Sequence, residues 1–436
     1  IPVALAIWRV ASRKLRTWKP FQFFLCHHKA SAGAFARLLK LSLQDSKRLH
    51  SEVFLDSDDL HNLDDLFDHL GNDTSNLLIV ATQQIFTRPW CVGEMCTARV
   101  RRVNTAVISL QPIGKFMSNI RWDVHLANIE QSDILTENGF SETMVKETLQ
   151  WVTQIPPICL PARLSNKVLA DLVNLIFSAE RTGQLAGIVE QSDEDIMETA
   201  STEASSILVS DPTNPEATAA ALVLQSMLAP QLAAMPSAIP VLVHHSLPQN
   251  VQAAILMCTN GCFENASFIS FILEMNEMGP APALLPVIAE ATFQIPSLER
   301  LQIWVNDAAQ EMHGSGSKLA EVVSMLFKEI ALMFQPHHDL HTVLVIRAKA
   351  VLQRLRAVVG TKQRHGTHPT HSSQQMLTTT QSLRESDADG KDYESDLDGV
   401  LPSFSASEGG VAHHRAGPSL KMITDEQLGS MRVIDV

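Results

Sequence analysis

Short apolar runs alternate with helical patterns over residues 21–177, and this alternation limits the folds open to the chain more than any other feature. Four runs have the hydrophobicity of strands that are buried on both faces: 21–26, 52–56, 77–82 and 105–110. Helical spacing of apolar residues follows at 32–43, 63–70 and 90–102, and a closing helix is expected at 164–177. The alternation predicts an α/β domain, with a parallel sheet covered by helices on both faces.

The second half of the chain repeats these patterns faintly, at an offset of about 180 residues. The matching strand-like and helical runs are 207–210, 216–228, 239–244, 253–259, 267–278 and 284–289, with a closing helix at 318–334. We interpret the match as a tandem duplication, so the α/β fold is expected twice. In the first half, residues 115–157 show no clear periodicity and are predicted to be irregular.

Composition divides the 436 residues further. The expected organisation is a basic connector from an upstream part at 1–20, a first domain at 21–180, an acidic linker at 181–203, a degenerate repeat at 204–357 and a disordered tail at 358–436. The apolar run at 1–8 is too short to span a bilayer. It is either the end of a membrane segment with a basic cytoplasmic flank or, as we favour, a solvated connector. A membrane contact is therefore expected only through an upstream segment.

Charge and cysteine content point to a cytoplasmic protein that does not bind nucleic acid. The net charge of −13 disfavours contact with phosphate backbones. The six cysteines lie scattered in apolar runs without zinc spacing, as reduced buried thiols do: Cys26, Cys91, Cys96, Cys159, Cys258 and Cys262. No metal site is predicted at His27 and His28, because adjacent strand residues point to opposite faces. The acidic loop at 56–59 lacks the glycine and glutamate of a calcium loop.

The stretch 88–98 places one carboxylate, Glu94, one turn beyond Trp90 at the start of a helix. It follows the apolar strand at 77–82, and open α/β sheets carry their chemistry at the carboxyl ends of such strands. Two interpretations stay open for each residue. Glu94 is either a working acid or an exposed first-turn acid that the helix dipole favours. Trp90 either borders a ligand or packs in the core.

Five motifs in order make the first half resemble a TIR (Toll/interleukin-1 receptor) domain: residues 24–33, 38–40, 53–56, 76–82 and 90–98. The chain is most similar to the NAD-cleaving branch of that family, over residues 21–177. The resemblance implies a flavodoxin-like sheet of five parallel strands, NAD as a substrate with no resident cofactor, and self-association or binding to other TIR domains. In this family a glutamate after a Trp-containing turn is the catalytic acid, and it corresponds to Glu94.

The resemblance also implies which residues border the bound NAD. They lie in the loops after the first two strands and beside Glu94: His27, His28, Lys29, Ser31, Ser57, Asp58 and Trp90. Lys29 and the first N–H groups of the next helix, with Ser31 as its N-cap, are expected to face the diphosphate. Enzymatic members often carry an aromatic residue or Arg where residues 27–29 stand, so the contacts with nicotinamide and with the phosphates are left undefined.

Three functions follow from these observations. The first is an NAD hydrolase, switched on by self-association, that uses Glu94 to form ADP-ribose or a cyclic product. The second is a non-catalytic TIR scaffold that signals through contacts between TIR domains. The degenerate second repeat favours the scaffold, because Phe271 stands at the position of Glu94 and Ser267 at that of Trp90. The third, a general nucleotide- or flavin-binding domain, lacks GxGxxG or any other phosphate loop.

Overall fold

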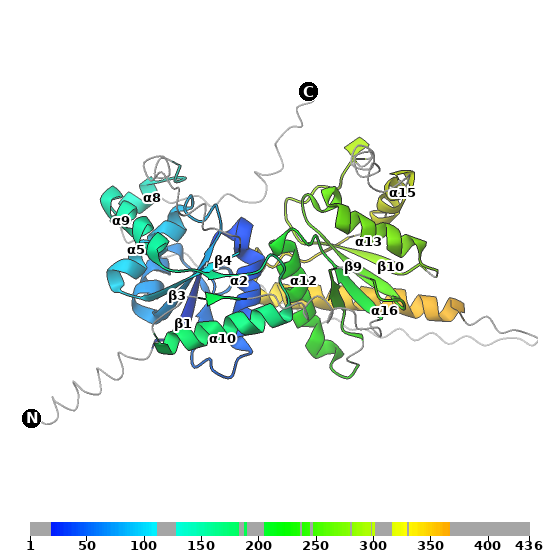
Figure 1. Ribbon diagram of the computed structural model, residues 1–436, viewed down its shortest axis with the longest axis horizontal. Helices are drawn as coiled ribbons and strands as arrows, with labels where there is room; N and C mark the ends of the chain where they lie inside the picture. Colours follow the sequence, from blue (N-terminus) through cyan, green and yellow to red (C-terminus); the bar gives the residue numbers. More distant parts are fainter. Residues whose placement is uncertain are drawn as a thin grey trace, which may run out of the picture. The chain divides into compact units, whose positions relative to one another are not determined.

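The computed structural model of the chain describes residues 19–110, 128–182, 187–189, 205–235, 238–244, 247–279, 281–297, 299–300, 316–328 and 331–366 (Figure 1). All of them belong to one compact unit. Most of the predicted connector, linker and tail lies outside the described residues. Within the part of the chain that is described, no helix has both the length and the apolar character needed to cross a membrane.

The first half contains a six-stranded sheet in which every strand pair is parallel, with the order β2-β1-β3-β4-β5-β6. Its strands are β1 (Phe21–His27), β2 (Glu52–Phe54), β3 (Thr74–Ala81), β4 (Asn104–Ser109), β5 (Ile158–Cys159) and β6 (Gly187–Ile188). The four strands expected from the apolar runs are confirmed. The sheet has six strands and not five, because β6, which lies in the predicted acidic linker, pairs with β5.

Helices cover both faces of this sheet (Figure 1). Helices α2 (Lys29–Gln44) and α10 (Asn166–Thr182) share a hydrophobic cluster with Phe23 and Leu25 of β1. Helices α5 (Pro89–Arg101) and α9 (Glu142–Gln154) share another cluster with Phe24 and Cys26, which point to the opposite face. Shorter helical segments complete this half: α3 (Asp56–Asp59), η1 (Leu63–Asp65), α4 (Leu66–Asp68), η2 (His69–Asp73) and α8 (Asp133–Glu137). The prediction of an irregular stretch at 115–157 is wrong where α8 and α9 form.

The second half contains a parallel five-stranded sheet with the order β11-β10-β9-β7-β8. Counted along the chain, this is the order of the first five strands of the other sheet, 2-1-3-4-5. The strands are β7 (Ser206–Val209), β8 (Val241–Val243), β9 (Ala253–Cys258), β10 (Ala283–Ile288) and β11 (Leu332–Met333). Four of them match the runs expected from the repeat, and β11 falls in a region predicted to be helical.

The helices of the second half depart from prediction toward the carboxyl end. They are α12 (Pro215–Leu228), η3 (Ala229–Leu232), η5 (Cys262–Glu264), α13 (Ala266–Glu277), α15 (Gly316–Leu326) and α16 (His341–Gly366). The closing helix predicted at 318–334 therefore ends at Leu326, and the chain continues into β11. Helix α16 continues past residue 358, where the predicted tail begins, to Gly366. The periodic apolar residues of 344–355 pack in the core and explain why this helix forms.

Residues of the two sheets meet in one hydrophobic cluster. It contains Phe23 and Leu25 of β1 together with Leu208 of β7 and Ile255 of β9. Between them, α2 packs directly on α12 (Figure 1). The first half is therefore not closed by its own residues alone, and part of its apolar surface is buried by the second half.

Polar contacts also join α2 to α12. The Glu216 carboxylate accepts the backbone N–H groups of Ala34, at 2.7 Å, and Phe35, at 3.0 Å. Burial raises the pKa of Glu216 to about 7, against a smaller lowering by these two hydrogen bonds. Glu216 is half-buried, and its carboxylate accepts N–H groups of the other helix, so it helps to fix how α2 and α12 pack.

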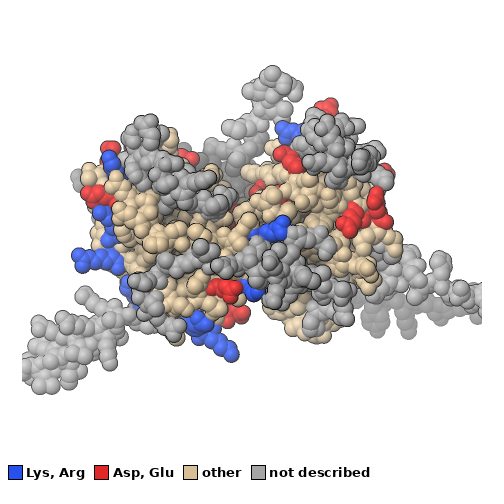
Figure 2. All heavy atoms as spheres, in the orientation of Figure 1, with Lys and Arg blue, Asp and Glu red and all other residues tan. Residues whose placement is uncertain are grey.

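The described surface carries charges of both signs in small separate groups, and most of the described residues on the face seen in Figure 2 are neither acidic nor basic. Several ion pairs neutralise charges locally, such as Arg99 with Glu147 at 3.0 Å and His69 with Asp73 at 3.1 Å. Exposed pairs of this kind contribute about 0–1 kcal/mol each to stability. These exposed ion pairs therefore contribute little to the stability of the fold.

Candidate functional site

The sequence-predicted site lies at the carboxyl ends of β1 and β3, which are neighbours in the first sheet. The helices that follow these strands, α2 and α5, pack on opposite faces of the sheet. Such a point, where the chain changes direction across the sheet, is where open α/β folds bind ligands. The structure thus brings the loop 27–31 and the helix carrying Glu94 to one edge.

The local sequence explains how α5 starts at this edge. Arg88 is extended, and Pro89 occupies the first turn, where its missing N–H costs nothing. Trp90 stacks on Phe67, with ring centroids 5.7 Å apart and planes 25° apart. A Cβ at residue 93 would lie 2.5 Å from the Phe67 ring, so only glycine lets this ring lie against α5. Trp90 is half-buried, so it packs on Phe67 and still presents part of its surface at this edge.

Glu94 is buried, with 6% of its surface exposed. Its Oε2 has no hydrogen-bond partner among the described residues. Burial raises the pKa of Glu94 to about 8, the Cys26 thiol lowers it, and the charge of Asp56 raises it further. The interpretation as an exposed first-turn acid is therefore wrong. At neutral pH most of the carboxyl is protonated, and a cation bound beside it would favour the ionised form.

Two thiols lie beside this carboxyl, and the sequence argument assigned them no role. The donor atoms of Cys26, Cys91 and Glu94 all lie within 4.8 Å of one another. The Cys91 thiol donates to the backbone oxygen of His27 at 3.2 Å, and the Cys26 thiol points to that of Cys91 at 3.8 Å. Burial raises the pKa of the Cys26 thiol well above its usual range. The even-numbered residues of β1 face α5. Because side chains alternate along a strand, this pattern could have predicted that Cys26 lies beside α5.

The loop after β1 holds its polar residues in short contacts. His27 is buried, with Nδ1 3.1 Å from the backbone oxygen of Leu25 and Nε2 3.7 Å from Asp56. Burial lowers the pKa of His27, while Asp56 raises it. The imidazole of His28 lies 3.0 Å from the Ser31 hydroxyl, and burial lowers its pKa too. Both imidazoles are therefore neutral at pH 7 and can each offer one nitrogen as acceptor.

Ser31 connects this loop to the end of β3. Its hydroxyl lies 2.8 Å from that of Thr82, a residue that the sequence argument did not single out. The prediction of Ser31 as an N-cap is wrong, because the helix begins at Lys29 with His28 at the N-cap position. Lys29 lines a cavity of about 550 Å³ together with residues of the second half, among them Glu216 and His337.

Ser57 and Asp58 belong to a different cluster. The buried Arg37 donates to Asp58, and it donates to the Ser57 hydroxyl at 2.9 Å. Lys40 lies 3.0 Å from Asp58. Arg37 also donates to the backbone oxygen of Asp339 at 2.8 Å. The structure therefore uses these two residues to hold the loop after β2 to α2 and to the second half, and their predicted contact with NAD remains a prediction.

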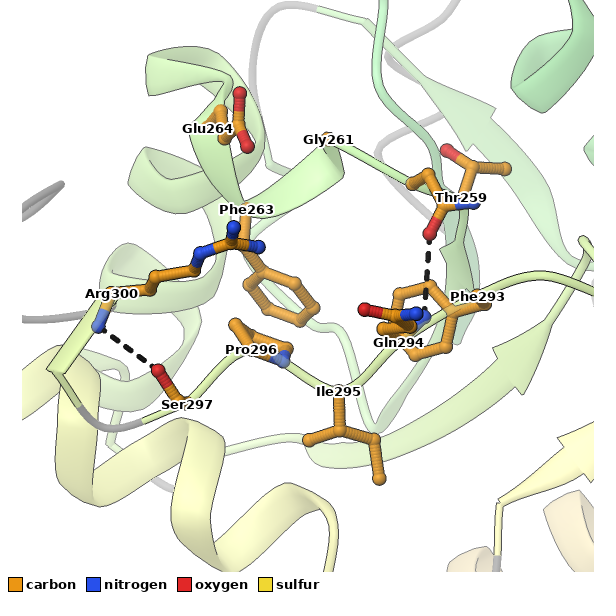
Figure 3. A pocket seen from close by; sticks show the side chains of 11 residues that line it. Thr259, Gly261, Phe263, Glu264, Phe293, Gln294, Ile295, Pro296, Ser297 and Arg300 are labelled. Atoms are coloured by element: carbon orange, nitrogen blue, oxygen red, sulfur yellow. Dashed lines mark hydrogen bonds between the residues drawn. The ribbon is translucent and has the colours of Figure 1, made fainter. Parts of the chain in front are cut away.

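The second half presents a different edge. Phe271, at the position of Glu94, is buried in α13, while Glu274 is exposed. The loops after β9 and β10 line a cavity of about 380 Å³, where Figure 3 shows Phe263 and Phe293 on its wall with Arg300 nearby. The N–H of Gln294 donates to the Asn260 side chain across this edge at 3.3 Å. None of the residues predicted from sequence to bind NAD lines this cavity.

No protein-family model matches the chain, and no curated protein matches its sequence.

Proposed function

We propose that the chain is a TIR-type signalling protein of the cytoplasm, whose first half cleaves NAD at the nicotinamide–ribose bond when copies associate. Glu94 is the catalytic carboxylate in this proposal. The observation that carries it is the buried carboxyl of Glu94, with an oxygen unpartnered among the described residues, at the edge where β1 and β3 end. The strand order 2-1-3-4-5, typical of flavodoxin-like folds, supports a TIR fold in both halves.

The chemistry needs one carboxylate and no proton donor. The nicotinamide of NAD is cationic in the substrate and leaves as a neutral molecule, so positive charge moves onto the ribose as the bond breaks. A carboxylate beside the ribose stabilises that developing charge, as the carboxylates of glycosidases do. Burial raises the pKa of Glu94 to about 8, and the positive charge of the substrate favours ionisation of its carboxyl. Charge is thereby created where the reaction uses it.

The other residues of the edge supply binding. The paired rings of Trp90 and Phe67 offer an aromatic wall next to the first turn of α5. Lys29 and the positive end of the α2 dipole, which no side chain caps, suit the diphosphate. His27 and His28, neutral at pH 7, can accept hydrogen bonds from ribose hydroxyls or the carboxamide. ADP-ribose or a cyclic form is the product, and other TIR domains are the protein partners.

The test is NAD consumption by the full chain clustered on a surface, beside its Glu94→Gln variant. The full chain is used because the two halves share a hydrophobic cluster. Gln has the size of Glu but carries no charge, so nicotinamide release should fall about 100-fold in the variant. Replacing the exposed Glu137 by Gln is the matched control and should leave turnover unchanged. A folded, clustered chain that releases no nicotinamide contradicts the enzymatic proposal.

A non-catalytic TIR scaffold is the second candidate, and one observation favours it. Ser57 and Asp58, which the resemblance places beside NAD, are engaged by Arg37. A scaffold needs only its surfaces, so binding to other TIR domains should survive Glu94→Gln. The scaffold is favoured if the unaltered chain and the Glu94→Gln variant both bind other TIR domains and neither of them consumes NAD.

A further inference from the structure

Three potential metal ligands converge beneath the edge of the first sheet. Cys26 comes from the end of β1, and Cys91 and Glu94 from the first two turns of α5. All three are buried, with exposed fractions of 0%, 2% and 6%. Their ligand atoms lie within 4.8 Å of one another, and no other group of three such donors is this close among the described residues.

The spacing is near that of a tetrahedral site. Bonds of about 2.3 Å to sulfur and about 2.1 Å to oxygen place tetrahedral ligands roughly 3.7 Å apart. The three donors therefore need to approach one another by about 1 Å, which small side-chain rotations can supply. Two thiols with one carboxylate suit zinc and similar thiophilic cations better than magnesium or calcium, which prefer oxygen ligands.

The carboxyl of Glu94 gives an independent reason to expect a ligand here. Its Oε2 is buried and has no hydrogen-bond partner among the described residues. A buried polar atom in that state costs free energy until a proton, a water molecule or a cation satisfies it. The two thiols beside it donate to backbone oxygens, and a sulfur atom that donates its proton keeps lone pairs that a cation can use.

We propose that Cys26, Cys91 and Glu94 form a binding site for a thiophilic divalent cation such as Zn²⁺. Binding forms two metal–sulfur bonds and one metal–oxygen bond, and it releases the protons of both thiols and of the carboxyl to solvent. No electron is transferred. The three protein ligands leave a fourth position for water or another small ligand.

The site also has a consequence that rests on the proposed function. A cation held by Glu94 occupies the carboxylate that would stabilise the ribose cation, so the metal-bound protein does not cleave NAD. The six cysteines are all unpaired, so Cys26 and Cys91 are thiols that can bind a metal without prior reduction. Zinc release would then switch the enzyme on.

Titration of the metal-free full chain with Co²⁺ tests the site without any reference to NAD. One equivalent should bind with the near-ultraviolet absorption of cobalt–thiolate bonds, and Zn²⁺ should displace it. Cys26→Ser, Cys91→Ser and Glu94→Gln should each weaken binding at least tenfold. Cys96→Ser on the same helix, outside the cluster, is the matched control and should leave binding unchanged. Circular dichroism identifies any variant that fails to fold.

X-ray absorption at the zinc edge of the unaltered chain keeps the proposal testable if those variants do not fold. Two sulfur ligands at about 2.3 Å are expected. They should persist in Cys258→Ser, which removes a thiol of the second sheet. A shell without sulfur, no stoichiometric binding, or tight binding in the folded Cys26→Ser variant would overturn the proposal. Stoichiometric metal binding by a chain that cleaves no NAD even after the metal is removed would overturn the proposed enzyme alone.

Discussion

Gly33 gives the most direct test of how the two halves are joined. It lies in α2, where the chain between β11 and α16 crosses the helix. A Cβ at residue 33 would lie 2.6 Å from the Cβ of His337 and 3.0 Å from its Cα, whereas ordinary contacts are 3.4–4 Å. Gly33→Ala therefore requires the crossing segment or the helix to move by about 1 Å.

Two opposing terms set the expected effect on the free energy of unfolding. Alanine is favoured over glycine in a helix by about 1 kcal/mol, and a site with free space would gain that amount. Overpacking in a close contact costs about 1–3 kcal/mol, and the upper part of that range applies because the atoms contacted belong to the backbone or lie next to it. The hydrogen bonds from Arg37 to Asp339 and Pro336 lie on the same segment and would lengthen. We expect a net loss of about 1–2 kcal/mol.

Urea unfolding of the full chain, followed by tryptophan fluorescence, measures this difference. The matched test is a double-mutant cycle with His337→Gly, which removes the Cβ that alanine would meet. In that background Gly33→Ala should cost at least about 1 kcal/mol less, since the closest contact is gone. If Gly33→Ala alone stabilises the chain by about 1 kcal/mol, residue 33 faces open space and the argued crossing is wrong.

Two further predictions concern acids that contact α2. The pKa of Glu216 is about 7 in the folded chain, against its usual value of 4.5. Between these two pH values the folded chain keeps a proton that the unfolded chain has lost. The stability that is fully present below about pH 4.5 is therefore lost as the pH rises through 7. Urea titration should show that the free energy of unfolding of the Glu216→Gln variant falls less between pH 5 and pH 8 than that of the unaltered chain, by about 2–3 kcal/mol. Asp58→Asn should cost about 2–3 kcal/mol, since it leaves the buried Arg37 without its carboxylate. Asp45→Asn, at an exposed position, is its control, and equal effects of the two would refute the role of the pair.

Local pattern predicted the strands β1, β3 and β4 because burial on both faces leaves a continuous apolar run in the sequence. Strand β11 lies in the apolar run 330–334, which the pattern assigned to the end of a helix, and the two-residue strands β5 and β6 were not predicted. All three form where a neighbouring strand edge offers its backbone groups. Helix α9 was missed although its signal was present. Ser141 caps it by accepting the N–H of Met144, and apolar residues at 145, 149 and 152 follow.

The sequence also predicted which residue types lie at the site, but it did not predict their burial or their hydrogen-bond partners. The sequence placed Glu94 after Trp90 at the end of a strand, and it placed an acidic loop after the second strand. Burial of Glu94, its position beside two thiols and the capture of Asp58 by Arg37 required the folded chain. These outcomes depend on which side chains surround a group, and a one-dimensional pattern does not contain that information.

By itself, then, the sequence determined an α/β chain with strands and helices in a repeated order, because periodicity records which face of each element is buried. Only the tertiary structure decided what those elements meet. Cys26 contacts Cys91 across 65 positions, and Arg37 contacts Asp339 across 302. Contacts over such separations arise from the packing of whole elements. The protonation of Glu94 and the side chains that surround it therefore follow from the fold and not from the local pattern.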